Sequence, residues 1–321
     1  MKFSRLALLF LAALTFLSDS PSAHAWGCKG HETVALFAEA HLSPAARAMV
    51  SKILAAGPID PALSRYCQEP NLDTFADAST WADDERTMKP DTAPWHFIDL
   101  PRGAPKSGLR KYCRPATGCV ISALTAQVAV LRDPIASPQA RADALRYIIH
   151  FVGDIHQPLH DTTNNDRGGN CVPVTFFGKT PRETNAAAES YSPNLHGVWD
   201  VNIIDQLSGS KTPEQLADDL NEKFQARESA WQSQKPNFET WAWESHQLAE
   251  EITYGALPVK IPIETARPVN TCADDHHIST RMLQLREDLE ADYQNAAAPT
   301  VEEQLTKAGI RLAALLNSLW P

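Results

Sequence analysis

Apolar residues return every three or four positions through most of the chain after residue 26. This spacing places them on one face of an α-helix. Segments with the pattern lie at 32–42, 44–56, 72–86, 120–133, 138–157, 192–207, 213–224, 239–252, about 278–294 and about 300–319. Strict alternation, which would favour a strand, is confined to 172–177. We therefore predict an all-α fold.

Local signals mark some helix ends and the loops between helices. Ser43 followed by Pro44 is typical of a helix start, and Pro158 should end the apolar helix before it. Polar stretches rich in Gly and Pro at 86–118 and 161–195 predict long irregular loops. Because binding residues are commonly displayed on loops held by a rigid frame, these two loops are candidate sites.

The first 25 residues have the pattern of a secretory signal peptide. Basic residues precede an apolar run at 6–17, and small residues end the segment at Ala25. The run is shorter than the roughly 20 residues that span a bilayer. We predict a signal peptide at 1–25, cleavage after Ala25, and a single domain at 26–321 that is secreted or periplasmic, with no stable membrane insertion.

Charge and cysteine content narrow the class of protein. The net charge of −10 argues against a protein that grips duplex DNA through many Lys and Arg contacts with phosphates. Six cysteines in an exported protein predict three disulfides, for which 15 pairings exist. Cys113 and Cys119 flank a turn-rich loop and are the favoured pair; the remaining pairs would be Cys28–Cys67 and Cys171–Cys272.

Two His-x₃-Asp pairs point to metal chemistry. His150 and Asp154 lie four apart in the most apolar helix, within "HFVGDIHQPLH", and His196 and Asp200 repeat the spacing in "NLHGVWD". That spacing puts both side chains on one helix face. A buried carboxylate needs a cation. Any single pair is more often a core histidine or a helix-face ion pair, but two pairs together favour Zn²⁺.

Further candidate ligands lie near these pairs and at the predicted new N-terminus. His160 follows Pro158, and "TWADD" and "WHFID" add three residues in apolar surroundings: Asp83, Asp84 and His96. Cleavage after Ala25 would give Trp26 a free amino group, which with its own carbonyl oxygen can chelate a metal beside His31. The alternative is that Trp26 only packs and His31 opens a helix.

In order along the chain, these motifs resemble a known family, the zinc-dependent single-strand-specific nucleases and 3′-nucleotidases (the S1/P1 nuclease family). The family shares an all-helical fold with bacterial zinc phospholipase C. The motifs are Trp26 at the cleavage site, His31, "WAD" at 81–83, "HFID" at 96–99, "HFVGDIHQPLH" at 150–160, "RGGN" at 167–170 and "HGVWD" at 196–200. The combination covers nearly the whole mature chain and is highly specific.

The resemblance implies three Zn²⁺ ions. The first would be held by Asp83, His96, His150 and Asp154. The second would be held by Trp26 (amine and carbonyl), His31 and the shared Asp154, and the third by His160, His196 and Asp200. Asp84 is the rival of Asp83, but Asp83 holds the "WAD" position and leaves Arg86 three residues on, where the family has an Arg facing phosphate.

The resemblance also implies the reaction. A hydroxide bridging two zinc ions attacks phosphorus in line, so Asp83, Arg86 and Asp154 are the expected catalytic residues. Single-stranded DNA and RNA would give 5′-phosphate products, and 3′-nucleotides would lose their phosphate. Phe97 and Asp99 would bind a base, by stacking and by hydrogen bonds to its edge. Stacking needs an unpaired base, so an acidic protein can still bind nucleic acid. The alternative for Phe97 is core packing.

We expect the protein to be a monomer. Two other functions are alternatives to that of a nuclease. A zinc phospholipase C acting on phospholipid would share the zinc site, but that relative carries Glu where this chain has Asp200 and lacks the "HFID" segment. A zinc-sequestering or adhesion protein would need no catalysis. The remaining histidines match no motif, and we predict that they lie on the surface: His41, His246, His276 and His277.

Overall fold

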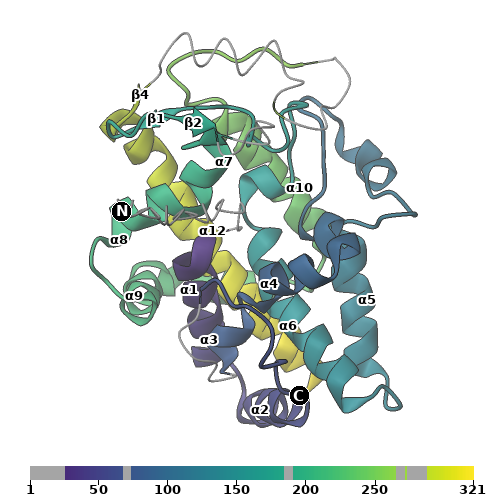
Figure 1. The fold of residues 1–321 in the computed structure, drawn as a ribbon. Coiled ribbons are helices and arrows are strands. Elements are labelled where there is room, and N and C mark those ends of the chain that lie inside the picture. The colour runs from purple at the N-terminus through teal and green to yellow at the C-terminus, as the bar shows by residue number, and fades with distance from the viewer. Residues whose placement is uncertain (1–25, 68–73, 184–190, 265–271, 273–287) are drawn as a thin grey trace, which may run out of the picture.

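The computed structural model describes residues 26–67, 74–183, 191–264, 272 and 288–321 (Figure 1). The fold is all-α, as predicted. Its α-helices are α1 (Gly27–Ala40), α2 (Pro44–Ala56), α3 (Phe75–Ala78), α4 (Trp81–Met88), α5 (Val120–Arg132), α6 (Pro138–Asp154), α7 (Leu195–Gly197), α8 (Ile203–Ser208), α9 (Pro213–Gln232), α10 (Phe238–Leu248) and α12 (Ala291–Leu319). The predicted signal peptide lies outside the described residues.

Shorter turns of helix connect these elements. Three are 3₁₀ turns and two are π turns: η1 (Pro90–His96), η2 (Lys106–Tyr112), η3 (Pro158–His160), η4 (Val198–Asn202) and η5 (Ala249–Thr253). Short strands pair in parallel, β1 (Thr175–Phe176) with β4 (Asp288–Leu289), and antiparallel, β2 (Arg182–Glu183) with β3 (Tyr191–Ser192). β1 lies inside the alternating segment at 172–177.

The long helix α12 runs diagonally through the molecule, and α1, α6 and α9 pack against it (Figure 1). One apolar cluster joins α2, α5 and α6 to the C-terminal end of α12. A second cluster joins α8 and α9 to the N-terminal half of α12. α6 also contacts α1, α4 and η1. It therefore contacts the elements that carry His31, Asp83 and His96.

Several helix boundaries follow the local signals. The Ser43 side chain accepts a hydrogen bond from the amide of Ala46 at the start of α2, as expected of a cap. α6 ends at Asp154, before Pro158, and the Gln157 side chain caps the next turn by accepting from the amide of Leu159. The loop predicted at 161–195 begins directly after this turn.

Three predicted helices differ from the structure. The segment 72–86 is broken after α3, where the Ser79 hydroxyl donates to the carbonyl of Ala76 instead of the helix continuing. The segment 192–207 contains the π turn η4 between α7 and α8. The predicted break before residue 300 is wrong, because α12 continues through Pro299. Burial of Ala297, Ala298 and Val301 offsets the hydrogen bond that proline removes.

Three disulfides connect the chain with the predicted pairing, Cys28–Cys67, Cys113–Cys119 and Cys171–Cys272. Among the described helices, none combines the length and the apolar character required to cross a membrane.

Candidate metal centre

Four side chains from three elements meet around the end of α6. Asp154 Oδ2 lies 3.1 Å from His96 Nδ1 and 3.2 Å from His150 Nε2. Asp83 Oδ1 on α4 lies 3.6 Å from the same His96 atom and 3.8 Å from the same His150 atom. All four residues are buried. The structure therefore brings together the four residues predicted for the first metal position.

His31 approaches the other oxygen of Asp154. Its Nε2 lies 3.4 Å from Asp154 Oδ1, and its ring stacks on that of His150 at 4.1 Å between centroids. Trp26 is buried beside it, and the Trp26 indole donates a hydrogen bond of 2.8 Å to the carbonyl of Gly153. The two oxygens of Asp154 thus face two different sets of side chains.

The third group lies at the start of the α7–η4–α8 segment. His196 Nε2 is 3.2 Å from Asp200 Oδ2, and the ring of His160 in η3 lies 4.9 Å from the ring of His196. The ligand atoms of His160, His196 and Asp200 are close enough together to hold one metal ion. The same holds for His96, His150 and Asp154, and for His31, Asp83 and His150. The predicted members of the third group are therefore adjacent in space.

Backbone carbonyls fix the orientation of three imidazoles. His150 Nδ1 donates to Ser79 O (2.6 Å), His160 Nδ1 to His96 O (2.7 Å) and His196 Nδ1 to Gly168 O (2.7 Å). A carbonyl only accepts, so each Nδ1 carries a proton, and in the neutral form of each ring Nε2 has a lone pair for a metal. This arrangement is typical of histidines that bind a metal.

Two glycines allow the close approach of these rings. A Cβ on Gly153 would lie 2.7 Å from Nδ1 of His31, so only glycine lets His31 pack against α6. Gly168 has φ +61°, and a Cβ there would lie 2.6 Å from the carbonyl oxygen of Leu159. Each glycine therefore lies beside a candidate ligand, Gly153 against His31 and Gly168 at the carbonyl that accepts from His196.

Burial keeps most of the imidazoles neutral. It lowers the pKa of His31, His96 and His196 to about 4, and it also lowers the pKa of His160. Neutral imidazole is the form that binds a metal. These four rings are therefore in the required state at pH 7 without having to lose a proton.

Charge pairing dominates at the centre of the first group. Burial opposes protonation of His150, but the Asp154 and Asp83 carboxylates outweigh it and raise the pKa of His150 to about 9. Burial likewise opposes ionisation of Asp154, but the charge of His150 and the nearby imidazoles of His31 and His96 hold its pKa well below the usual range. Asp200 has less support, and burial raises its pKa to about 7. A cation beside Asp200 would keep that carboxyl ionised.

The donor set fits zinc. Imidazole nitrogen with carboxylate oxygen is a common combination for Zn²⁺. Several buried atoms in the groups have no hydrogen-bond partner among the described residues: His31 Nε2, Asp154 Oδ1, His160 Nε2 and Asp200 Oδ2. Buried polar atoms are rarely left unsatisfied, and a metal ion would engage all four. The nitrogen of Trp26 is bonded to residue 25, which lies outside the described residues. Of Trp26, we therefore describe only the buried ring and the carbonyl.

The structure separates Asp83 from its rival Asp84. Asp83 faces the imidazoles, whereas Asp84 accepts hydrogen bonds from Arg65 and from the amide of Tyr66. Arg86 Nη2 lies 3.4 Å from Asp83 Oδ1. The Arg86 guanidinium also adds to the burial that lowers the pKa of His196. Arg86 therefore lies between the first and third groups.

The "HFID" segment turns two side chains outward. Ile98 and Leu100 are buried, whereas Phe97 between buried neighbours is half-buried and Asp99 is exposed, the alternation of an extended chain. The amide of Ile98 donates to the carbonyl of His160. Phe97 and Asp99 therefore share one face next to the third group. The surrounding chain removes part of the hydration of the Asp99 carboxyl and so raises its pKa, although the side chain reaches solvent. The positive charges of Arg114 and Arg167 oppose this shift.

Sequence reasoning missed several residues of the site. Gln157 donates to Asp200 Oδ1 at 2.5 Å and so orients that carboxylate; the only signal was its place in "HFVGDIHQPLH". Asp161 is fully buried, and burial raises its pKa well above the usual value.

The predictions for the other histidines had mixed outcomes. The surface assignment of His246 is wrong, because this ring is 2% exposed and contacts Thr162 and the carbonyl of Asp161. His41 is half-buried against Phe37. His276 and His277 lie outside the described residues.

Comparisons with known proteins show which family the chain belongs to. The family described as S1/P1 Nuclease matches residues 26–321. Nuclease S1 of Aspergillus oryzae is 30% identical over 97% of this chain and 94% of its own length. Nuclease P1 of Penicillium citrinum is 30% identical over 92% and 97%, and Endonuclease 2 of Arabidopsis thaliana is 26% identical over 98% and 97%. With the match spanning every candidate ligand, the chain belongs to the S1/P1 nuclease family.

Proposed function

We propose that residues 26–321 form one catalytic domain that binds three zinc ions and cleaves single-stranded DNA and RNA to 5′-phosphate products. The same site would remove the phosphate from 3′-nucleotides. One observation carries the proposal: the two oxygens of Asp154 face different groups, Oδ2 toward His96 and His150 and Oδ1 toward His31. A carboxylate so placed suits a pair of metal ions that share it, the arrangement that supports in-line displacement at phosphorus.

The ligand assignment follows the three groups. Asp83, His96, His150 and Asp154 would hold one ion. His31 and the Trp26 amine and carbonyl would hold a second ion with Asp154, and His160, His196 and Asp200 a third. Zinc bound there would lower the pKa of a coordinated water toward about 7 and would stabilise negative charge on phosphoryl oxygens. The Trp26 carbonyl already accepts from the amide of Gly30 and has a second lone pair free for a metal.

The protein's own side chains would position the substrate. Arg86, between the first and third groups, is placed to bind phosphoryl oxygens held by both and to balance the charge that develops there. Asp83 holds Arg86 in that position through their 3.4 Å contact. Asp200 is held by Gln157, so the third group keeps its geometry while phosphate enters and leaves.

Base recognition accounts for the preference for single strands. The half-buried ring of Phe97 offers a face for stacking and the exposed Asp99 carboxylate accepts from a base edge. A paired base presents neither its face nor its edge. Arg114 and Arg167 near Asp99 would meet the flanking phosphates of an extended strand. This local positive charge supports binding despite the net charge of −10.

The proposal includes export of the monomeric chain. Three disulfides, each between cysteines of one chain, suit an oxidising compartment. Cleavage after Ala25 would create the amino group that the second metal position uses. All proposed ligands belong to one chain, so no partner subunit is required.

The test is turnover by the purified mature protein on single-stranded DNA, duplex DNA, RNA, a 3′-nucleotide and phosphatidylcholine. We expect rapid cleavage of both single strands and the 3′-nucleotide, slow cleavage of duplex, and loss of all activity with a chelator until zinc is restored. Turnover of phosphatidylcholine alone would favour a phospholipase. Bound zinc without turnover of any substrate would favour a zinc-sequestering protein.

A further inference from the structure

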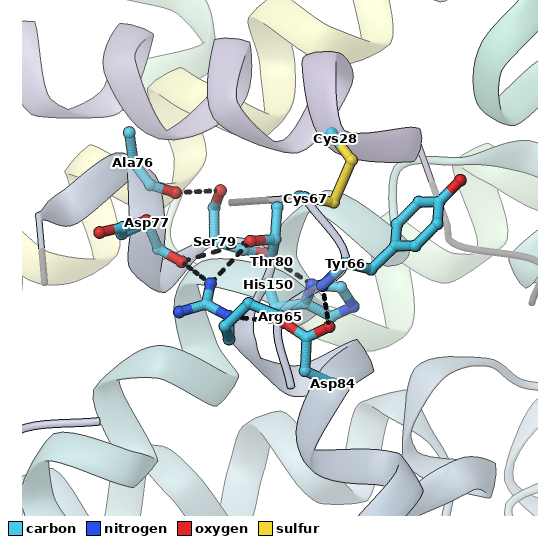
Figure 2. Close-up of a disulfide and its surroundings, with 10 residues drawn as sticks. All are labelled: Cys28, Arg65, Tyr66, Cys67, Ala76, Asp77, Ser79, Thr80, Asp84 and His150. Atoms are coloured by element: carbon cyan, nitrogen blue, oxygen red, sulfur yellow. Dashed lines mark hydrogen bonds and ion pairs between the residues drawn. A yellow bond between two sulfur atoms is a disulfide. The ribbon is translucent and has the colours of Figure 1, made fainter. Parts of the chain in front are cut away.

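The adjacent carboxylates Asp83 and Asp84 have different surroundings (Figure 2). Arg65 Nε donates to Asp84 Oδ2 at 2.6 Å, and the amide of Tyr66 donates to Asp84 Oδ1 at 2.9 Å. The side chains of Arg65 and Asp84 are 3% and 4% exposed. Both oxygens of Asp84 are thus engaged away from the metal groups, which leaves Asp83 to face the imidazoles.

The other end of the Arg65 guanidinium spans the junction between α3 and α4. Nη2 donates to the carbonyl of Asp77 (2.9 Å) and to the hydroxyl of Thr80 (3.0 Å). Between these two residues lies Ser79, whose carbonyl accepts from His150 Nδ1 at 2.6 Å. Figure 2 shows Arg65 at the centre of this junction, with Asp84 on one side and Asp77, Ser79 and Thr80 on the other.

The segment that carries Arg65 is covalently joined to α1. Cys67 forms a disulfide with Cys28, which lies two residues after Trp26 and three before His31. Figure 2 shows this disulfide directly above the junction. The segment 65–67 therefore contacts the supports of both the first group and the N-terminal residues of the second.

We propose that Arg65 is a positioning residue for the first metal position: it keeps Asp84 turned away and holds the α3–α4 junction so that Asp83 and His150 converge on one ion. The inference rests on the proposed zinc site. The guanidinium suits the role because its planar fork donates in several directions at once, which a Lys ammonium at the end of a flexible chain cannot reproduce.

The test is zinc affinity of the mature protein, measured by competition with a chromogenic chelator well below the melting temperature. Arg65→Met keeps a long apolar stem but loses every donor. We expect its tightest-held zinc position to weaken by about 10- to 100-fold, the range typical when a supporting residue of a metal site is lost. Arg65→Lys, which keeps the charge, should lose less affinity and carries the test if Arg65→Met does not fold.

Arg311→Met is the matched control. Arg311 is also buried at 2% and ion-paired, with Glu244 at 2.7 Å. It joins α12 to α10 and lies 3.0 Å from Nε2 of His156, which is not a proposed ligand. The Arg311→Met variant should have a lower melting temperature than the parent protein but the same zinc affinity. Unchanged zinc affinity in both Arg65 variants, or an equal loss in Arg311→Met, would overturn the inference. A parent protein that binds no zinc would instead overturn the proposed function.

Discussion

Asp154 shows how one side chain can organise several others. It is fully buried at the end of α6, and each of its oxygens faces a different imidazole set. Burying a carboxylate costs free energy of folding unless nearby positive charge compensates it. Phe97 and Asp99 have the opposite character, because Phe97 is half-buried, Asp99 is exposed and neither is a proposed metal ligand. Residues for metal binding and for base recognition can therefore be tested separately.

Phe97→Ala should weaken cleavage of single strands by roughly 1–3 kcal/mol, about 5- to 150-fold in kcat/KM, because a stacking face is lost. Zinc content should stay unchanged, since no proposed ligand is altered. Cleavage of bis(p-nitrophenyl) phosphate, which has no base, should suffer less.

Phe177→Ala is the control for that change, because Phe177 is another aromatic that reaches solvent (38% exposed) but lies outside "HFID". It should leave both rates unchanged. An equal loss on both substrates in Phe97→Ala, or a loss of zinc, would show that Phe97 has a structural role beside His96.

Among the elements, α1 and α6 contribute the most to the site. α1 begins at Gly27, immediately after Trp26, so the helix places Trp26 and His31 on one side of α6. Gly153 permits this contact, because any larger residue would displace the His31 ring. The N-terminal turn of α1 therefore places the predicted new terminus beside Asp154.

A variant that retains one extra residue before Trp26 should bind two zinc ions instead of three and lose most activity. The amino group is moved away, while the buried indole and its hydrogen bond to Gly153 are kept, so the protein should still fold. Elemental analysis and the melting temperature check both points. The control is a variant with one extra residue after the exposed Pro321, which should change neither the zinc content nor the melting temperature. Full activity of the N-terminally extended protein would exclude the amine as a ligand.

At the scale of the whole molecule, the metal groups join segments that are distant in sequence. The candidate ligands run from Trp26 to Asp200 and belong to elements packed in both apolar clusters. Buried imidazoles and carboxylates at such a junction oppose folding unless cations compensate them. Bound zinc should therefore contribute to stability as well as to nuclease activity.

Removing zinc with a chelator should lower the melting temperature, and adding zinc should restore it. An ion that binds only the folded state stabilises it by about 4.1 kcal/mol at 1,000 times its Kd. Elemental analysis of the restored protein should give three zinc ions per chain. Calorimetry showing the same melting temperature with and without the chelator would contradict a structural contribution from zinc.

The sequence by itself determined the features that depend on local spacing. Helical periodicity predicts most of the helices, and the His-x₃-Asp pairs predict His150 beside Asp154 and His196 beside Asp200, because residues four apart share a helix face. The order of motifs along the chain was sufficient to indicate the family, and the turn-rich loop between Cys113 and Cys119 indicated that these two cysteines pair. Helix breaks within 72–86 and 192–207 were missed because side-chain hydrogen bonds and a π turn leave little trace in periodicity.

Only the tertiary structure decided how the distant segments combine. Asp84 is held by Arg65, which lies 19 residues away in the chain, whereas Asp83 faces the imidazoles. The neutral state of His31 depends on burial against α6, and the orientation of His196 depends on the carbonyl of Gly168. Contacts of this kind arise from packing between elements, and neither spacing nor composition encodes them.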